Sequence, residues 1–332
     1  MSESLEMAIG SGPVVGSFNY LRASVAPSLF RNGRLLTRRD GDGNDGGTEG
    51  LDLERREVEV ADGRALEGEA RCTLARNGFE LATCPPTDPE LDFFAHGPVV
   101  DRYYDECAEI VRAASGARDV FAFDHNVRPA TGKRSGQRLV DGQQVQPPAR
   151  VVHGDYTLTS APQRLRDLAG LPADNDTYRR RLGSGETLLD ADRVEAVVAD
   201  GRFALINVWR NVADEPVARD PLALCDGQSV LPDELAVFEI HYADRIGENY
   251  FARYAPRHRW TYYPEMTRDE VLLIKQWDSN GPLARSGGKE PDASNPEAPC
   301  TFSFHSAFYD DATPPDAPAR WSIEVRCVAL FD

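Results

Sequence analysis

The sequence predicts a mainly β protein, a β-sandwich or jelly roll with helical additions, and three observations lead to this class. Seven short runs of β-branched and aromatic residues follow one another between residues 203 and 331, with Pro, Gly or Asp between them. The first half of the chain instead combines helical periodicity with polar loops. Neither an internal repeat nor a linker interrupts the 332 residues, so we expect a single domain. In it, residues 1–118, an N-terminal extension and a helix, pack on a core of residues 119–332.

The N-terminal extension is predicted to contain strands, a polar loop and one helix. The run "SFNYLRAS" favours a strand, and "RRDGDGNDGGTEG", residues 38–50, favours a surface loop. The D-x-D-x-N start of this loop is similar to a calcium loop, but Leu51 stands at the twelfth position, where such a loop has Glu. "REVEVADGRAL" then predicts a strand and turn, and the Asn-Gly pair at residues 77–78 predicts a hairpin. Helical spacing of apolar residues predicts a helix over residues 99–115, ended by Gly116.

The core is predicted to begin with a strand, a long loop and a second strand. "RDVFAFDHNVR" and "ARVVHGDYT" have strand character, and the polar residues 129–148 between them indicate a loop. A capping box at residues 160–163 predicts the start of a short helix, and "DADRVEAVVADG" predicts another. The seven strand-like runs follow: "FALINVWRNV", "LAVFEIHYADR", "NYFARYAP", "HRWTYYPEM", "VLLIKQWDS", "TFSFHSAFYD" and "RWSIEVRCVALF".

Charge and composition exclude several classes of partner. The net charge of −17 would repel nucleic acid and anionic membranes, so we expect neither as a partner. The chain has no apolar run of about 18 residues that could span a bilayer, and its start resembles no signal peptide. Six cysteines are scattered without a C-x-x-C pair. This pattern predicts free thiols in a reducing cytoplasm.

A His-x-Asp pair is the strongest chemical signal in the sequence. His153 and Asp155 share a face of an extended strand, because side chains alternate with period two. A second histidine would complete a 2-His-1-carboxylate triad, which leaves three positions open on iron(II). His305 is the preferred third ligand, because it lies in an aromatic strand-like run near the C-terminus. The rival pair, Asp124 and His125, is adjacent, so its side chains point to opposite faces of a strand. The other candidates for the third ligand are His96, His241 and His258.

A basic strand follows His305. Arg320, Ser322 and Arg326 alternate with apolar residues and therefore share one face. A guanidinium can grip a carboxylate through two parallel hydrogen bonds, and a hydroxyl adds a third. H-x-D, a distant His and then R-x-S is the layout of 2-oxoglutarate-dependent iron oxygenases. Four further residues are predicted to contact substrate: Asn207, Trp209, Tyr262 and Lys275.

Several blocks of the sequence, in order, resemble one known family. "VVHGDYT", "INVWRNV" with "DPLALCDGQSV", "HRWTYYPEMTRDEVLLIKQWDS" and "FSFHSAFYDD…ARWSIEVRCVALF" are similar to the gibberellin desaturase and cephamycin methoxylase-subunit (hydroxylase/desaturase) family. The likeness extends from about Asp119 to Phe331. It implies a double-stranded β-helix, a cupin-like jelly roll, with flanking helices. Where many relatives have an acidic or polar residue between the Arg and the Ser, this chain has Trp321, on the opposite face.

The resemblance also implies a site and a reaction. Iron would be held by His153, Asp155 and His305, and 2-oxoglutarate by Arg320 with help from Ser322, Arg326 being the alternative anchor. The implied function is a non-haem iron(II)/2-oxoglutarate-dependent oxygenase that hydroxylates, desaturates or otherwise oxidises a C–H bond of a small natural product. Its cofactors would be Fe(II), 2-oxoglutarate and O2, with ascorbate as a stimulant.

Two other functions remain open at this point. The iron site could act without 2-oxoglutarate, if the substrate itself chelated the metal. Alternatively, the chain could be a non-catalytic subunit that assists a partner enzyme, as the methoxylase resemblance allows. A homodimer, or a complex with an enzyme of the same pathway, is the assembly that we expect.

Overall fold

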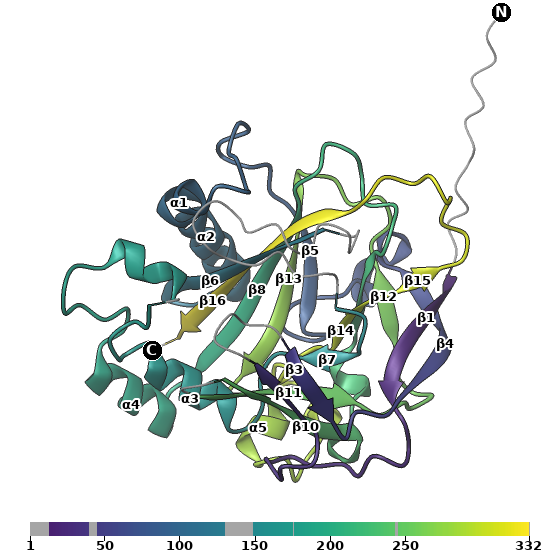
Figure 1. Ribbon diagram of the computed structural model, residues 1–332, viewed down its shortest axis with the longest axis horizontal. Coiled ribbons are helices and arrows are strands. Elements are labelled where there is room, and N and C mark those ends of the chain that lie inside the picture. The colour runs from purple at the N-terminus through teal and green to yellow at the C-terminus, as the bar shows by residue number, and fades with distance from the viewer. Residues whose placement is uncertain (1–12, 40–44, 130–148, 175, 243–244, 332) are drawn as a thin grey trace, which may run out of the picture.

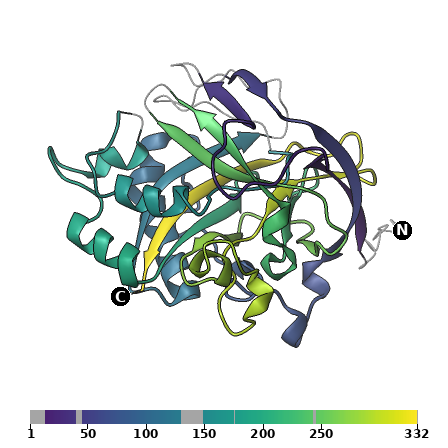
Figure 2. The ribbon, with the colours of Figure 1, turned by 90° about the horizontal axis from the view of Figure 1, so that it is seen from below.

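The computed structural model describes residues 13–39, 45–129, 149–174, 176–242 and 245–331. Its core consists of two β-sheets, and its short helices lie on the outside (Figure 1). The five helices are α1 (His96–Pro98), α2 (Tyr104–Ser115), α3 (Ser160–Asp167), α4 (Ala191–Asp200) and α5 (Pro282–Arg285). A π-helical turn, Val99–Tyr103, joins the first two. Viewed from below, α3 and α4 lie together on one side of the sheets (Figure 2).

The smaller sheet has five antiparallel strands in the order β5-β13-β8-β16-β6. These strands are β5 (Phe79–Thr83), β13 (Glu270–Asp278), β8 (Phe203–Asn211), β16 (Trp321–Leu330) and β6 (Asp119–Pro129). β8 is buried along its whole length, because both of its faces are covered. Apolar residues on one face of β16, such as Val325 and Cys327, share a core cluster with Val111 of α2. The opposite face of β16 looks toward the second sheet.

The larger sheet contains the remaining strands, in the order β15-β1-β4-β12-β9-β14-β7-β11-β10-β2-β3. Their bounds in that order are β15 (Tyr309–Asp310), β1 (Val14–Leu21), β4 (Leu53–Asp62), β12 (Trp260–Tyr262), β9 (Leu222–Cys225), β14 (His305–Ala307), β7 (His153–Gly154), β11 (Ile246–Ala252), β10 (Leu235–His241), β2 (Leu36–Arg39) and β3 (Asp45–Glu49).

The two sheets face one another and together form a jelly roll. Leu222 and Leu224 of β9 pack in one cluster with Trp209 of β8 and Leu272 of β13, so side chains of both sheets meet between them. From β6 onward the chain repeatedly crosses between the sheets, as β7, β9 and β14 belong to one and β8, β13 and β16 to the other. This confirms the predicted mainly β fold of the double-stranded β-helix type.

Local signals near the chain start predicted some elements and missed others. Gly116 ends α2 with a φ of 70°, the left-handed conformation that glycine adopts without strain. The loop predicted over residues 38–50 is instead partly a hairpin, because β2 and β3 pair across it; residues 40–44 lie outside the described residues. The hairpin predicted at residues 77–78 is absent from the described structure, since β5 pairs with the distant β13 and the residues before Gly78 form turns.

Of four other expectations, three fall on described residues. The loop predicted over residues 129–148 lies almost wholly outside the described residues. α3 begins at Ser160 as expected, but Thr159 is its N-cap and makes no capping hydrogen bond through its side chain. All six cysteines are free, as predicted. In the parts of the chain that the structure covers, no helix is both long and apolar enough to cross a bilayer.

Candidate metal centre

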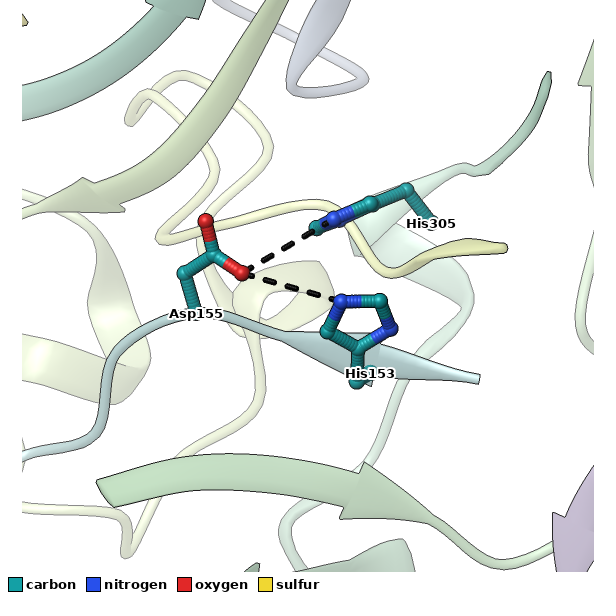
Figure 3. A group of neighbouring side chains, drawn as sticks. All are labelled: His153, Asp155 and His305. Carbon is teal, nitrogen blue, oxygen red and sulfur yellow. Dashed lines mark ion pairs between the residues drawn. The ribbon is translucent and has the colours of Figure 1, made fainter. Parts of the chain in front are cut away.

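Three side chains from distant parts of the sequence converge between the sheets (Figure 3). His153 on β7 and His305 on β14 are direct cross-strand partners, and their ring centroids are 4.2 Å apart. Asp155 follows β7 and turns its Oδ1 atom toward both rings, 3.7 Å from His153 Nε2 and 3.8 Å from His305 Nε2. One ligand atom of each residue lies within 4.8 Å of the others. The structure therefore brings together the predicted H-x-D pair and the predicted third ligand.

The protonation of both imidazoles suits metal binding. His153 donates a hydrogen bond from Nδ1 to the Val151 carbonyl oxygen at 2.7 Å, so its lone pair is on Nε2, which faces Asp155. Burial, with His305 nearby, lowers the pKa of His153 to about 4. Burial also lowers the pKa of His305. Both rings are thus neutral at physiological pH and can each offer a nitrogen lone pair.

The carboxylate of Asp155 is held by its outer oxygen. Asn207 donates from Nδ2 to Asp155 Oδ2 at 3.1 Å, and Arg326 Nε lies 3.6 Å from the same atom. The main-chain N–H of Asp155 donates to Gln276 Oε1 at 3.1 Å. Burial acts to raise the pKa of Asp155, but the Arg326 guanidinium and the hydrogen bond from Asn207 act against it, and the pKa is lowered. Asp155 is therefore ionised, with Oδ1 turned toward the imidazoles.

This donor set fits ferrous iron. Two neutral imidazoles and one carboxylate are the ligands of the facial triad, which suits iron(II) and leaves positions open on one side. The separations of 3.7 and 3.8 Å are too long for hydrogen bonds, so these three ligand atoms do not satisfy one another. His305 Nδ1 and Asn207 Oδ1 are, in addition, buried polar atoms without a partner in the described structure.

A cavity of about 480 Å³ opens beside the triad. His153, Asp155 and Arg326 are among the residues that line it. Its walls carry both charge and apolar surface; they include Asp124, Asn126 and Arg128 of β6, and Ile240 with Tyr242 near the end of β10. This cavity is large enough for a small organic molecule to reach the metal ligands.

Arg320 and Arg326, the two predicted anchors, have different surroundings. Arg320 is 3% exposed, donates from Nη1 to the Asp220 carbonyl oxygen and lies over the Trp209 ring, 5.6 Å from its centroid. Its Nε is buried without a partner in the structure as described. The Asp220 carboxylate is already paired with Arg150 at 2.9 Å. Burial lowers the pKa of Arg320 to about 10, so the side chain is still a cation at neutral pH. Among the described residues, no carboxylate lies at ion-pair distance from it.

Arg326, by contrast, has partners on all sides. Its Nη1 donates to Asp124 Oδ2 at 2.8 Å, and its Nη2 lies 3.5 Å from Glu324 Oε1. In the amide orientation that satisfies its neighbours, Asn126 accepts from both terminal nitrogens of Arg326, at 2.8 and 3.0 Å. With the Asp155 contact added, every nitrogen of this guanidinium faces a protein acceptor. Ser322 is buried between the two arginines on the same face of β16.

The four predicted substrate contacts separate into two pairs. Asn207 binds Asp155, and Trp209 lies beneath Arg320, so both are between the sheets. Tyr262 pairs with Ala223 of β9, whereas His305 pairs with the next residue of that strand. Because neighbouring residues of a strand point to opposite faces, Tyr262 is on the face of the sheet opposite to His305. Its ring meets Phe308 edge to face at 5.5 Å. Lys275 Nζ lies 3.1 Å from Asp278 Oδ2.

None of these four residues is among those that line the cavity, and their contact with substrate stays a prediction.

Substitution of Lys275 by methionine is expected to destabilise the protein without changing 2-oxoglutarate affinity. Although burial acts to raise the pKa of Asp278, Lys275 and Arg202 lower it, so Asp278 is a buried anion. Removing one cation leaves that charge with Arg202 alone, and we expect the free energy of unfolding to fall by about 3 kcal/mol. Denaturant unfolding measures this, with the exposed Lys289→Met as the matched control. Unchanged stability together with lost turnover would instead assign Lys275 to the substrate.

Some site residues were missed by sequence reasoning. Asn126 and Arg128 line the cavity, as does Asp124, which the sequence indicated only as part of the rival metal pair, and Glu324 shares the inner face of β16 with Arg326. The alternation of polar and apolar residues in this strand could have revealed them, because Asp124, Asn126 and Arg128 are polar and share one face of it. The alternative metal pair is not formed, since the His125 side chain is buried against Tyr104, with Nδ1 2.9 Å from its hydroxyl.

The other histidines also have structural neighbours. His241 lies 2.9 Å from Glu239 and His258 lies 3.1 Å from Glu234, in each case between Nε2 and a carboxylate oxygen. The ring of His96 stacks on His125 with centroids 5.3 Å apart. None of the three belongs to the group of metal-ligating side chains that converges in the described residues.

One family model and several known proteins are similar to this chain. A family model described as "YDMC: Oxidoreductase/YMDC permease-like domain" matches residues 32–330. An uncharacterized protein in the dcmA 3' region of Methylophilus leisingeri is 40% identical over 195 residues, 58% of this chain and 88% of that protein. The hydroxylase/desaturase efuI of Hormonema carpetanum is 28% identical over 347 residues, 98% of this chain and 97% of that protein.

One relative has also been solved as a structure. The Fe(II)/2-oxoglutarate-dependent dioxygenase nvfI of Aspergillus novofumigatus is 29% identical over 230 residues, 69% of this chain and 66% of that protein. The structure of the iron and alpha-ketoglutarate-dependent endoperoxidase NvfI matches with a TM-score of 0.70 and 21% identity, covering 97% of this chain and 99% of that chain. This structural likeness supports the same fold.

Proposed function

Since the chain belongs to the oxidoreductase family of the matching domain model, alongside hydroxylase/desaturases and Fe(II)/2-oxoglutarate-dependent dioxygenases, we propose that it is an iron(II)/2-oxoglutarate-dependent dioxygenase. It oxidises a C–H bond of a small molecule. The observation that carries this proposal is the convergence of His153, Asp155 and His305 beside an open cavity, in the ligand set that leaves iron(II) accessible on one side.

Each part of the site has a distinct task in this function. His153, Asp155 and His305 hold the metal through two nitrogens and one oxygen. Iron(II) held there, together with 2-oxoglutarate and O2, would supply the oxidising chemistry. Arg320 binds the distal carboxylate of 2-oxoglutarate, because it is a buried cation whose Nε donor lacks a partner in the described structure, and Ser322 assists. The surrounding sheets exclude water from these groups.

The substrate is a small natural product, and the product is an alcohol, an alkene or another oxidised form of it. The cavity beside the triad supports this assignment by its size and by its combination of apolar and charged walls. We further propose a cytoplasmic protein that folds as one domain, with residues 1–118 packed on the core of residues 119–332. It acts as a homodimer or together with an enzyme of the same pathway. Light scattering of the purified protein tests the homodimer.

An anaerobic titration tests the proposed function directly. Adding Fe(II) and then 2-oxoglutarate to the purified protein is expected to produce the weak absorption band of an iron–keto acid chelate at about 500 nm. Admission of O2 is then expected to release succinate. Iron binding without this band would favour an oxidase whose substrate itself chelates the metal. A band that persists in O2, with no succinate in a single turnover, would favour a non-catalytic subunit.

A further inference from the structure

The outer oxygen of Asp155 accepts a hydrogen bond from Asn207 and forms an ion pair with Arg326. Asn207 Nδ2 is 3.1 Å and Arg326 Nε 3.6 Å from Oδ2, whereas Oδ1 faces the two imidazoles at 3.7 and 3.8 Å. Asn207 and Arg326 are cross-strand partners on β8 and β16, so the sheet itself places both donors at one oxygen. The two oxygens of this carboxylate are thereby made different before any metal binds.

The guanidinium of Arg326 is fixed in this position by further contacts. Asp124, at 2.8 Å, and Asn126, at 2.8 and 3.0 Å, hold its terminal nitrogens from β6. Glu324, 3.5 Å away, completes the ring of acceptors from the same strand as Arg326. A planar guanidinium held at its far end cannot turn away from Asp155 without breaking these contacts.

We propose that Asn207 and Arg326 are positioning residues that keep Asp155 bound to iron through one oxygen, and that Arg326 is not an anchor for 2-oxoglutarate. The inference rests on the proposed function. A carboxylate can bind a metal through one oxygen or through two. One oxygen, with two imidazoles, leaves three positions of an octahedral ion open, whereas two oxygens leave two. A chelating keto acid takes two positions, so only binding through one oxygen reserves a place for O2.

The contrast with Arg320 supports this division of roles. Arg320 lacks a carboxylate at ion-pair distance among the described residues, and its Nε has no partner there. Arg326, in contrast, is surrounded by side-chain acceptors. A ligand carboxylate would therefore complete the environment of Arg320, but would have to displace existing acceptors from Arg326.

The first experiment counts the water molecules bound to the metal. Mn(II) is loaded into the protein without any keto acid, and proton relaxation gives the number of coordinated waters. We expect about three in the unmodified protein and about two in the double variant Asn207→Ala/Arg326→Met, with each single variant between these values. Asn211→Ala is the matched control, because Asn211 is buried on the same strand but binds Glu215 and Met266 rather than Asp155. It is expected to keep about three waters.

The second experiment separates positioning from anchoring. Anaerobic Fe(II) protein is titrated with 2-oxoglutarate and with 2-oxopentanoate, which has the same keto acid end but no distal carboxylate. Arg326→Met is expected to change both dissociation constants by the same factor, within about threefold. Arg320→Gln is expected to weaken 2-oxoglutarate about 100-fold and to leave 2-oxopentanoate within about twofold.

Two results would overturn the proposal. One is a water count that stays at three in the double variant. The other is a selective loss of 2-oxoglutarate affinity in Arg326→Met, which would make Arg326 the anchor. If Arg326→Met does not fold, Arg326→Lys replaces it in both experiments, because it keeps the positive charge near Asp124 and Glu324. If the unmodified protein binds no keto acid, the proposed function fails, but the Mn(II) water count still tests the positioning of Asp155.

Discussion

Replacement of His305 by alanine is expected to weaken iron(II) binding by more than about 100-fold and to abolish 2-oxoglutarate-dependent succinate formation. His305 supplies one of only two imidazoles in the triad, and its ring is buried beside His153. Without it, the metal would retain one nitrogen and one oxygen from the protein, which is too few to hold it in the face of competing water. Anaerobic Fe(II) titration followed at the chelate band measures the loss of affinity.

A matched histidine variant controls for loss of a ring elsewhere. His241→Ala removes an imidazole that lies 2.9 Å from Glu239 and does not belong to the triad, so its iron affinity is expected to remain within about twofold. The ligand assignment would have to be abandoned if His305→Ala bound iron as tightly as His241→Ala. Thermal unfolding of both metal-free variants shows whether His305→Ala has kept its fold.

Substitution of Arg320 by glutamine is expected to lower 2-oxoglutarate affinity about 100-fold while iron affinity stays within about twofold. Two charge-assisted hydrogen bonds to the distal carboxylate would be lost, and each is typically worth about 1.5 kcal/mol. The metal ligands would be unaffected, because Arg320 has no hydrogen bond or ion pair with them in the described structure and instead contacts the Asp220 carbonyl oxygen and the Trp209 ring. Isothermal calorimetry under argon gives both constants, with Fe(II) titrated into the metal-free protein and 2-oxoglutarate into the iron-loaded protein.

The same substitution at a remote arginine provides the comparison. Arg259 is paired with Asp226 at 2.8 Å and is 62% exposed, so Arg259→Gln is expected to bind 2-oxoglutarate normally. Equal affinities in Arg320→Gln and Arg259→Gln would show that the distal carboxylate is bound somewhere else. In that case the buried charge of Arg320 would need another explanation.

Much of the metal site could be predicted from the sequence, because strand periodicity fixes which side chains share a face. His153 and Asp155 are two apart on an extended segment, and Ser322 and Arg326 alternate along β16, with Arg320 directly before its first residue. The choice of His305 depended on order along the chain and on the aromatic run around it. The structure brings His153, Asp155 and His305 together, as the prediction of a shared metal requires.

The remainder depends on pairing between distant strands, which local patterns do not encode. Tyr262 and Lys275 are both buried and polar, and a sequence cannot tell whether such a side chain faces a cavity or a partner such as Asp278. The roles of Asp124 and Asn126 become visible only once β6 lies beside β16. In the same way, β5 could not be assigned to β13 from the Asn-Gly signal that precedes it.

The direct pairing of His153 with His305 has a consequence for the durability of the fold. β7 is only two residues long and β14 only three, so few main-chain hydrogen bonds join them. An ion bound to both rings would act as a cross-link that closes a loop of roughly 150 residues. A cross-link between such distant residues restricts the unfolded chain far more than a local contact does. The metal-loaded protein should therefore unravel more slowly than the metal-free protein and resist proteases for longer, quite apart from any turnover.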